Sequence, residues 1–142
     1  MSNDFAVTIK PAFEFLAHRG YRLTYEDVSS SFDNGSLIYE GEGQRVTIER
    51  DRGQVSFTMR SRTDYHDVDE EILRLLLADA SHYRKPESGR QFTVESSATF
   101  LRTNLSTLEG LFAASRVQET IRRAEALKIE RAEALFGPLE QR

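Results

Sequence analysis

The sequence predicts an α+β fold, in which an antiparallel sheet of three or four strands is covered by an N-terminal helix and by helices from the C-terminal half. Three observations predict it. A two-residue hydrophobic period holds over successive segments between residues 32 and 59, turn residues separate these segments, and helical periodicity holds on both sides of them. A sheet of this size needs helices to cover its apolar face.

The strands are predicted from strict alternation of apolar and polar residues. Val46 and Ile48 alternate with polar residues in one segment, and Val55, Phe57 and Met59 do so in the next. Each segment therefore has one buried face and one wet face. Alternating residues Tyr21, Leu23 and Tyr25 predict a further strand, so that the sheet spans residues 21–60.

Turn residues join the predicted strands. Residues 50–54 (RDRGQ) have the chemistry of a short hairpin loop, with Asp51 opening the turn and Gly53 able to take a positive φ. Residues 40–43 (EGEG) join the segment 36–39 to the Val46 strand in the same way. Asn34-Gly35 is another turn signal.

Helices are predicted at residues 3–19, 67–80, 93–103 and 107–136. The first has Phe5, Ile9, Ala12, Phe13 and Leu16 on one stripe and Gly20 placed to end it, although Pro11 favours a shorter helix that starts in its own first turn. Asp67 is expected to cap the second helix, with Glu70 as the reciprocal residue of a capping box.

The last predicted helix is unusually long. It starts at a second capping-box pattern around Ser106, ends at Gly137-Pro138, and would be about 45 Å long at about 1.5 Å per residue. A helix of this length outreaches a small sheet. Its distal half, with Ala124, Leu127, Ala132 and Leu135, either packs on a second subunit to form a homodimer or crosses the whole sheet diagonally.

Composition indicates one domain over residues 1–142. The chain has no Cys, which excludes disulfides, thiolate metal sites and Cys nucleophiles. No stretch approaches the roughly 18 apolar residues of a membrane span. The formal net charge of −4 and the pI of about 5.4 argue against nucleic acid as a partner. We therefore expect a cytoplasmic protein that binds neither membrane nor nucleic acid.

Motifs that would carry catalysis or hold a cofactor are missing from the sequence. It contains no Gly-x-Ser-x-Gly elbow, no phosphate-binding glycine loop followed by Lys-Ser/Thr, and no His-Glu-x-x-His. We therefore predict no catalytic residue, no metal ligand and no cofactor, and expect that the protein is not an enzyme.

The most suggestive segment for function is the acidic run around one aromatic residue and one histidine. As partner-binding residues we predict Asp64, Tyr65, His66, Asp67, Asp69 and Glu70. Exposed carboxylates beside an aromatic ring would bind a Lys/Arg-rich protein surface quickly through electrostatic steering. Two other interpretations stay open: a hard-cation or acid/base site that uses His66, and an acidic helix start with no other role.

The central meander resembles the layout of small bacterial proteins, some of which are thought to be immunity partners of polymorphic or contact-dependent toxins. The resemblance lies in Phe32-x-Asn34-Gly35, a strand, a glycine turn, a second strand and residues 50–55 (RDRGQV). It implies a single-domain cytosolic protein whose acidic surface blocks a toxin by direct binding.

Two other functions remain open from the sequence. The first is an acidic homodimeric secretion chaperone that dimerises through the long last helix and binds an extended client. The second is a small metal- or His-dependent enzyme built around His66 and its neighbouring carboxylates.

Overall fold

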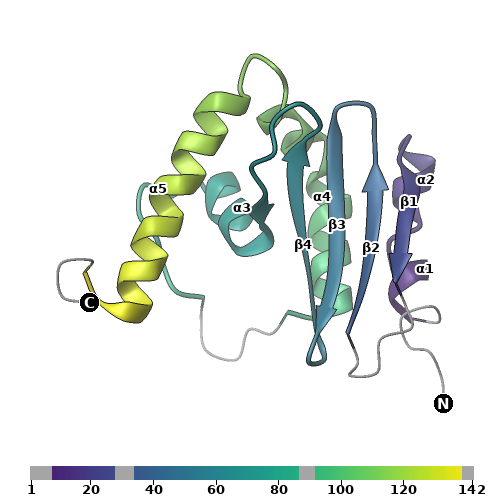
Figure 1. Ribbon diagram of the computed structural model, residues 1–142, viewed down its shortest axis with the longest axis horizontal. Helices are drawn as coiled ribbons and strands as arrows, with labels where there is room; N and C mark the ends of the chain where they lie inside the picture. The colour runs from purple at the N-terminus through teal and green to yellow at the C-terminus, as the bar shows by residue number, and fades with distance from the viewer. Residues whose placement is uncertain (1–7, 28–33, 87–91, 139–142) are drawn as a thin grey trace.

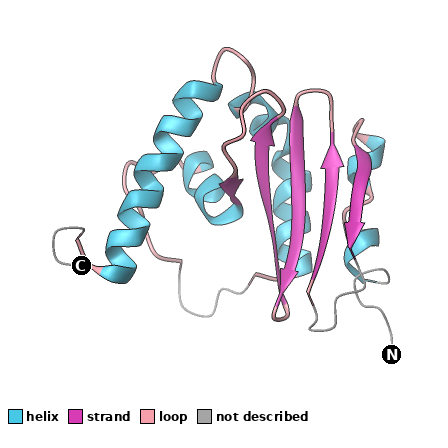
Figure 2. Ribbon diagram, in the orientation of Figure 1, coloured by secondary structure: helices cyan, strands magenta, loops and turns pink. Residues whose placement is uncertain are grey.

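A computed structural model of the chain describes residues 8–27, 34–86 and 92–138, and it contains one five-stranded antiparallel sheet in the order β1-β2-β3-β4-β5. The strands are β1 Arg22–Asp27, β2 Gly35–Glu40, β3 Gln44–Asp51, β4 Gln54–Ser61 and β5 Val68–Asp69. The helices are α1 Lys10–Ala12, α2 Phe15–His18, α3 Glu70–Leu77, α4 Val94–Leu111 and α5 Val117–Phe136. The predicted α+β class is confirmed, and β5 adds a strand to the predicted sheet (Figures 1 and 2).

One face of the sheet packs against the helices. Figure 1 shows α4 running behind the long strands, with α1 and α2 behind β1, while α5 lies outside the sheet against α3. The residues that alternate inward on the three central strands are all buried: Leu37, Tyr39, Val46, Ile48, Val55, Phe57 and Met59. Their period of two places them on one side of the pleat, as the sequence predicts.

The β3–β4 hairpin closes through a two-residue turn. Asp51 pairs with Gln54, and the two residues between them have positive φ angles, 54° at Arg52 and 82° at Gly53. Two successive positive φ angles define a type I′ turn, whose twist matches that of the flanking strands. The predicted hairpin is confirmed.

Strand β1 departs from simple alternation. A bulge between Leu23 and Tyr25 shifts the register, so that Leu23 packs on the core while Tyr25 pairs with Ile38 and is 51% exposed. Tyr21 is buried just before the strand. Gly41 lies against the Tyr21 ring so closely that a Cβ there would come within 2.7 Å of a ring carbon. The predicted strand is confirmed, but the bulge keeps Tyr25 off the inward face to which Leu23 belongs.

The N-terminal helix is shorter than the predicted 3–19 and is split in two. Of the predicted residues 3–19 that the structure describes, only those in α1 and α2 are α-helical; residues 1–7, including Phe5, lie outside the description. Pro11 lies in the first turn of α1, where its missing N–H costs no hydrogen bond, and this placement agrees with the shorter alternative. The apolar stripe is confirmed, since Ile9, Phe13 and Leu16 are buried.

The C-terminal helices have different boundaries from the predicted 93–103 and 107–136. Thr93 caps α4 as its position suggests, through a 3.1 Å bond from the Ser96 N–H, but α4 continues through Ser106 to Leu111. Its buried residues Leu101, Leu105 and Leu108 form an unbroken i, i+3/i+4 stripe across the predicted break, and burial of this stripe keeps the helix continuous.

The chain instead reverses between α4 and α5. The Thr120 hydroxyl of α5 donates to the Leu111 carbonyl at the end of α4 over 2.6 Å, which satisfies one of the last carbonyls of that helix. Helix α5 has 20 residues and is therefore about 30 Å long. Its Ala124 and Leu127 are buried within this chain, whereas Leu135 is 61% exposed. The length that suggested a second subunit is therefore absent.

Helix α3 begins later than the predicted 67–80. Val68 and Asp69 extend the sheet as β5, which pairs Val68 with Met59, and the helix spans Glu70–Leu77. Asp69, not Asp67, is the cap: its carboxylate accepts the Ile72 N–H at 3.4 Å. Among the described residues, no helix is long and apolar enough to cross a membrane.

Ionisation of the Tyr21 hydroxyl is expected to destabilise the fold at alkaline pH. Burial, and the 2.8 Å hydrogen bond that its hydroxyl donates to the Glu109 carboxylate, raise the pKa of Tyr21 above its ordinary value. Its contribution is fully present below the unfolded pKa near 10 and falls as pH rises above it, by about 1.4 kcal/mol per pH unit. In urea denaturation, we expect Tyr21→Phe to lose about 1–2 kcal/mol at neutral pH and to show a shallower alkaline decline than the wild type. An equally steep decline in the variant would contradict this assignment.

Candidate functional site

On the side of the sheet opposite α4, no helix of the described residues covers strands β1 to β4 (Figure 1). Cross-strand partners share a face, so the register defines this surface as three rows. The first row is Arg22, Glu40, Arg45 and Arg60; the middle row is Tyr25, Ile38, Thr47, Thr58 and Asp69; the third row is Asp27, Ser36, Glu49 and Ser56. We call this surface the open face. Its charges are segregated along the strand direction.

The first row forms the arginine end of the open face. The Arg45 guanidinium binds the Glu40 carboxylate, with Nε 2.8 Å from Oε1, and Arg62 approaches the same carboxylate at 3.7 Å. The hydrogen bond from Arg45 lowers the pKa of Glu40 below its ordinary value. Arg60 lies over the Tyr65 ring at 4.8 Å, a cation–π contact. The arginine end therefore has one carboxylate among four guanidinium groups.

The opposite end of the open face is acidic. A hollow of about 310 Å³ lies between the β3–β4 hairpin and the start of α3; it is lined by Glu49, Asp51, Gln54, Ser56, Asp69, Glu70, Glu71 and Phe92. A second hollow on the other side of β3 is lined by Asp27, Asn34, Gly35, Ser36, Glu49, Arg50 and Asp51. Glu49 and Asp51 line both hollows and are exposed. We call the surface formed by Asp27, Glu49, Asp51, Asp69 and Glu71 the acidic end.

The structure does not bring the six residues of the predicted acidic segment together on one surface. Asp64 lies in the loop after β4, where its carboxylate accepts hydrogen bonds from the backbone N–H of His66 at 3.1 Å and from Gln118 of α5 at 3.1 Å. A further bond from the His66 ring is the main reason that the pKa of Asp64 falls below its ordinary value. Asp64 thus holds the loop on α5.

The next three predicted residues are accessible. Tyr65 is 74% exposed, the His66 side chain is 58% exposed, and the Asp67 side chain is also exposed, while its carbonyl accepts a bond from Lys128 at 2.6 Å. Tyr65 stacks on Arg60, so this part of the loop borders the arginine end.

Asp69 and Glu71 belong to the acidic end, but their charges are partly neutralised. Arg131 of α5 binds both carboxylates, at 2.8 and 3.0 Å to Asp69 and at 2.9 Å to Glu71. The hydrogen bonds to Asp69 are the largest cause of a raised pKa at Arg131. Tyr83 donates a further bond to Glu71 at 3.0 Å. This cluster fastens α5 to the start of α3, and leaves Glu49 and Asp51 as the more available carboxylates.

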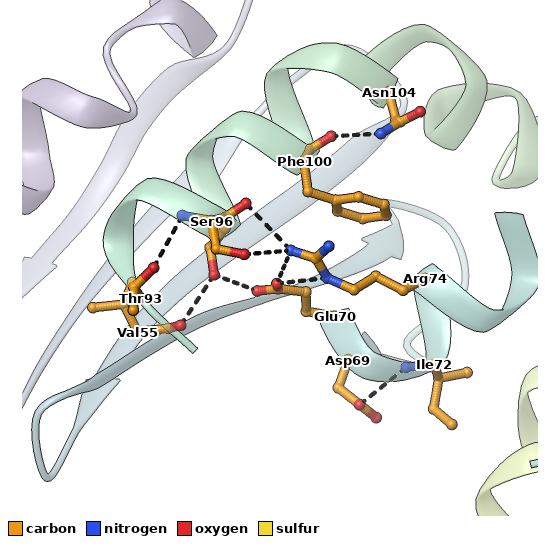
Figure 3. A network of polar contacts seen from close by, with 10 residues as sticks. Val55, Asp69, Glu70, Ile72, Arg74, Thr93, Ser96, Phe100 and Asn104 are labelled. Atoms are coloured by element: carbon orange, nitrogen blue, oxygen red, sulfur yellow. Dashed lines mark hydrogen bonds and ion pairs between the residues drawn. The ribbon is translucent and has the colours of Figure 1, made fainter. Parts of the chain in front are cut away.

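Glu70 is buried and belongs to the core. Its carboxylate binds Arg74 one turn later, at 3.0 and 2.7 Å, and accepts the Ser97 hydroxyl of α4 at 2.6 Å (Figure 3). The Arg74 guanidinium lies 4.1 Å from the centre of the Phe100 ring and donates to the Ser96 carbonyl. Only 1% of the Glu70 side chain is exposed, so it is not available to a partner.

Within residues 8–27, 34–86 and 92–138, no group of three or more His, Asp or Glu side chains is placed to hold a metal ion. His66 contacts Asp64, but the pair lies on an exposed loop beside α5 and not in either acidic hollow.

Sequence reasoning missed the carboxylates on β3 and the arginines on the open face. Glu49 and Asp51 appeared only as wet-face and turn residues, because single-strand alternation does not say which strands are neighbours. The spacing of Glu70 and Arg74 could have predicted their ion pair, since oppositely charged residues at i and i+4 meet on one helix face.

Comparison with known proteins adds no functional assignment. No protein-family model matches the chain, no curated protein is significantly similar to its sequence, and no solved structure matches it significantly.

Proposed function

We propose that this protein is a non-enzymatic protein-binding module, most concretely an immunity-type inhibitor that neutralises a bacterial toxin in the cytoplasm by direct binding. The observation that carries the proposal is the acidic end of the open face, where Glu49 and Asp51 stand exposed between two hollows. Clustered carboxylates accelerate the approach of a basic protein and orient it.

The acidic end suits a protein partner with projecting Lys or Arg side chains. The hollow beside the hairpin has two exposed carboxylates on one wall and the Arg131-bound Asp69 and Glu71 on the other. A long basic side chain that enters it gains charge-assisted hydrogen bonds to Glu49 or Asp51. Toxins that act on nucleic acids need such basic side chains in their active sites, and covering them would block the toxin.

The test starts with a tagged full-length protein recovered from its native cells, with the captured partner identified by mass spectrometry and the complex sized by light scattering. We expect one partner in a stoichiometric complex, and expression of that partner alone should be toxic unless this protein is co-expressed. Glu49→Lys/Asp51→Lys should weaken binding at least tenfold and abolish protection, because it reverses both exposed carboxylates.

Glu133→Lys/Glu95→Lys is the matched control. It makes the same change in net charge on exposed helix positions away from the open face and should bind and protect like the wild type. A partner that binds the Glu49/Asp51 variant with unchanged affinity would rule out the acidic end as its site. A captured partner with no toxicity would reject the immunity function itself.

A further inference from the structure

The charges of the open face are strongly ordered. On β1 to β4 its three rows carry three arginines, Arg22, Arg45 and Arg60, and three carboxylates, Asp27, Glu40 and Glu49, while Asp69 of β5 is bound by Arg131. All three arginines lie in the first row, and two of the three carboxylates lie in the third. The two outer rows are separated by four residues along β3, or about 13 Å. A surface of this kind is complementary to a second copy of itself whose strand direction is reversed.

A two-fold axis gives this arrangement when it lies midway between two facing sheets, perpendicular to the strands and over the middle row. Each strand then faces the same strand of the other copy, with the first row over the third. On β1, Arg22 of one copy then lies opposite Asp27 of the other; on β3, Arg45 lies opposite Glu49. On β4 and β2 the remaining charges, Arg60 and Glu40, face the serines of the third row. An axis parallel to the strands would instead set Arg22 opposite Arg60. Charge complementarity therefore selects one arrangement.

We propose that the open face associates with a second copy of this chain, sheet against sheet, as a two-fold symmetric dimer. Sheets that pack face to face lie about 10 Å apart with strands inclined by about 30°, so the central strand β3 keeps its alignment best. The middle row supplies Tyr25 and Ile38 as the apolar contacts. Because charge pairs determine orientation more than affinity, the dimer is weak and sensitive to salt.

Charge reversals on β3 test the arrangement in the full-length protein by sedimentation equilibrium across the micromolar to millimolar range. Glu49→Lys and Arg45→Glu each place like charges opposite one another twice and should raise the dimer dissociation constant at least tenfold. An equimolar mixture of the two variants should form a heterodimer, and Arg45→Glu/Glu49→Lys should dimerise again by itself, because both restore the opposite-charge pairs between the two copies.

Exposed positions off the face provide matched controls. Glu133→Lys and Arg84→Glu change the net charge by the same amounts as the two reversals and should dimerise like the wild type. Thr47→Arg puts two like charges near the axis and should abolish the dimer without touching Arg45 or Glu49. Circular dichroism establishes that each variant is folded.

Three results would overturn the proposal. The wild type could be monomeric at every concentration, neither single reversal could weaken the dimer, or the double-reversal variant could dimerise no more tightly than the single-reversal variants. The inference does not depend on the proposed immunity function. Arg45→Glu distinguishes the two proposals, because it should break the dimer but should not lower the affinity for a basic partner that binds the acidic end.

Discussion

Phe57→Ala is expected to lower the free energy of unfolding by about 3–5 kcal/mol, measured by urea denaturation. Phe57 is 1% exposed at the centre of β4, and its ring stacks on that of Phe100 from α4 at a centroid distance of 6.2 Å. The truncation removes apolar burial and leaves a cavity between the sheet and the helix, which rigid neighbours fill only in part.

The adjacent residue on the same strand is the matched control. Thr58 follows Phe57 but points to the open face, so Thr58→Ala should change stability by no more than about 0.5 kcal/mol. A large loss at both positions would mean that something covers the open face of the isolated chain. A small loss at both would contradict the placement of Phe57 in the core.

Glu70→Ala is expected to cost about 3 kcal/mol, because it leaves the Arg74 guanidinium without its carboxylate beneath α4. The estimate lies at the lower end for a broken buried pair, since 19% of the Arg74 side chain remains exposed and can be hydrated. Glu70→Gln keeps an acceptor for both Ser97 and Arg74 and should lose about 1–2 kcal/mol.

A double-mutant cycle isolates the ion pair. Glu70→Met/Arg74→Met removes both charges and keeps most of the side-chain volume, so it should be more stable than Glu70→Met alone. If the double variant loses the sum of the two single losses, Glu70 and Arg74 are not coupled and the network in Figure 3 has little energetic weight.

The meander could be predicted because its signals are local. Alternation identified the inward residues of β3 and β4, and the Gly53 turn identified their hairpin; all of these residues lie where expected. The bulge in β1 could not be predicted this way, since one extra residue reverses the face of everything beyond it.

Helix boundaries were less predictable because local signals competed with packing. Ser106 has the pattern of a helix cap but lies inside α4, where the stripe of Leu101, Leu105 and Leu108 is buried without a break. Helix α5 contains the sequence RAEAL twice, at residues 123–127 and 131–135, and these repeats illustrate the same limit. Leu127 is buried and Leu135 is 61% exposed, because eight residues rotate a helix by about 80° and the second repeat lies beyond the core.

The sequence by itself determined the α+β class, the inward residues of the central strands and the turns that join them. Only the tertiary structure decided where the charges act. It buried Glu70, tied Asp69 and Glu71 to Arg131, and gathered Asp27, Glu49 and Asp51 at one end of the open face. The physical reason is that periodicity assigns each residue to a face of its own element, whereas strand register and helix packing decide which distant charges become neighbours.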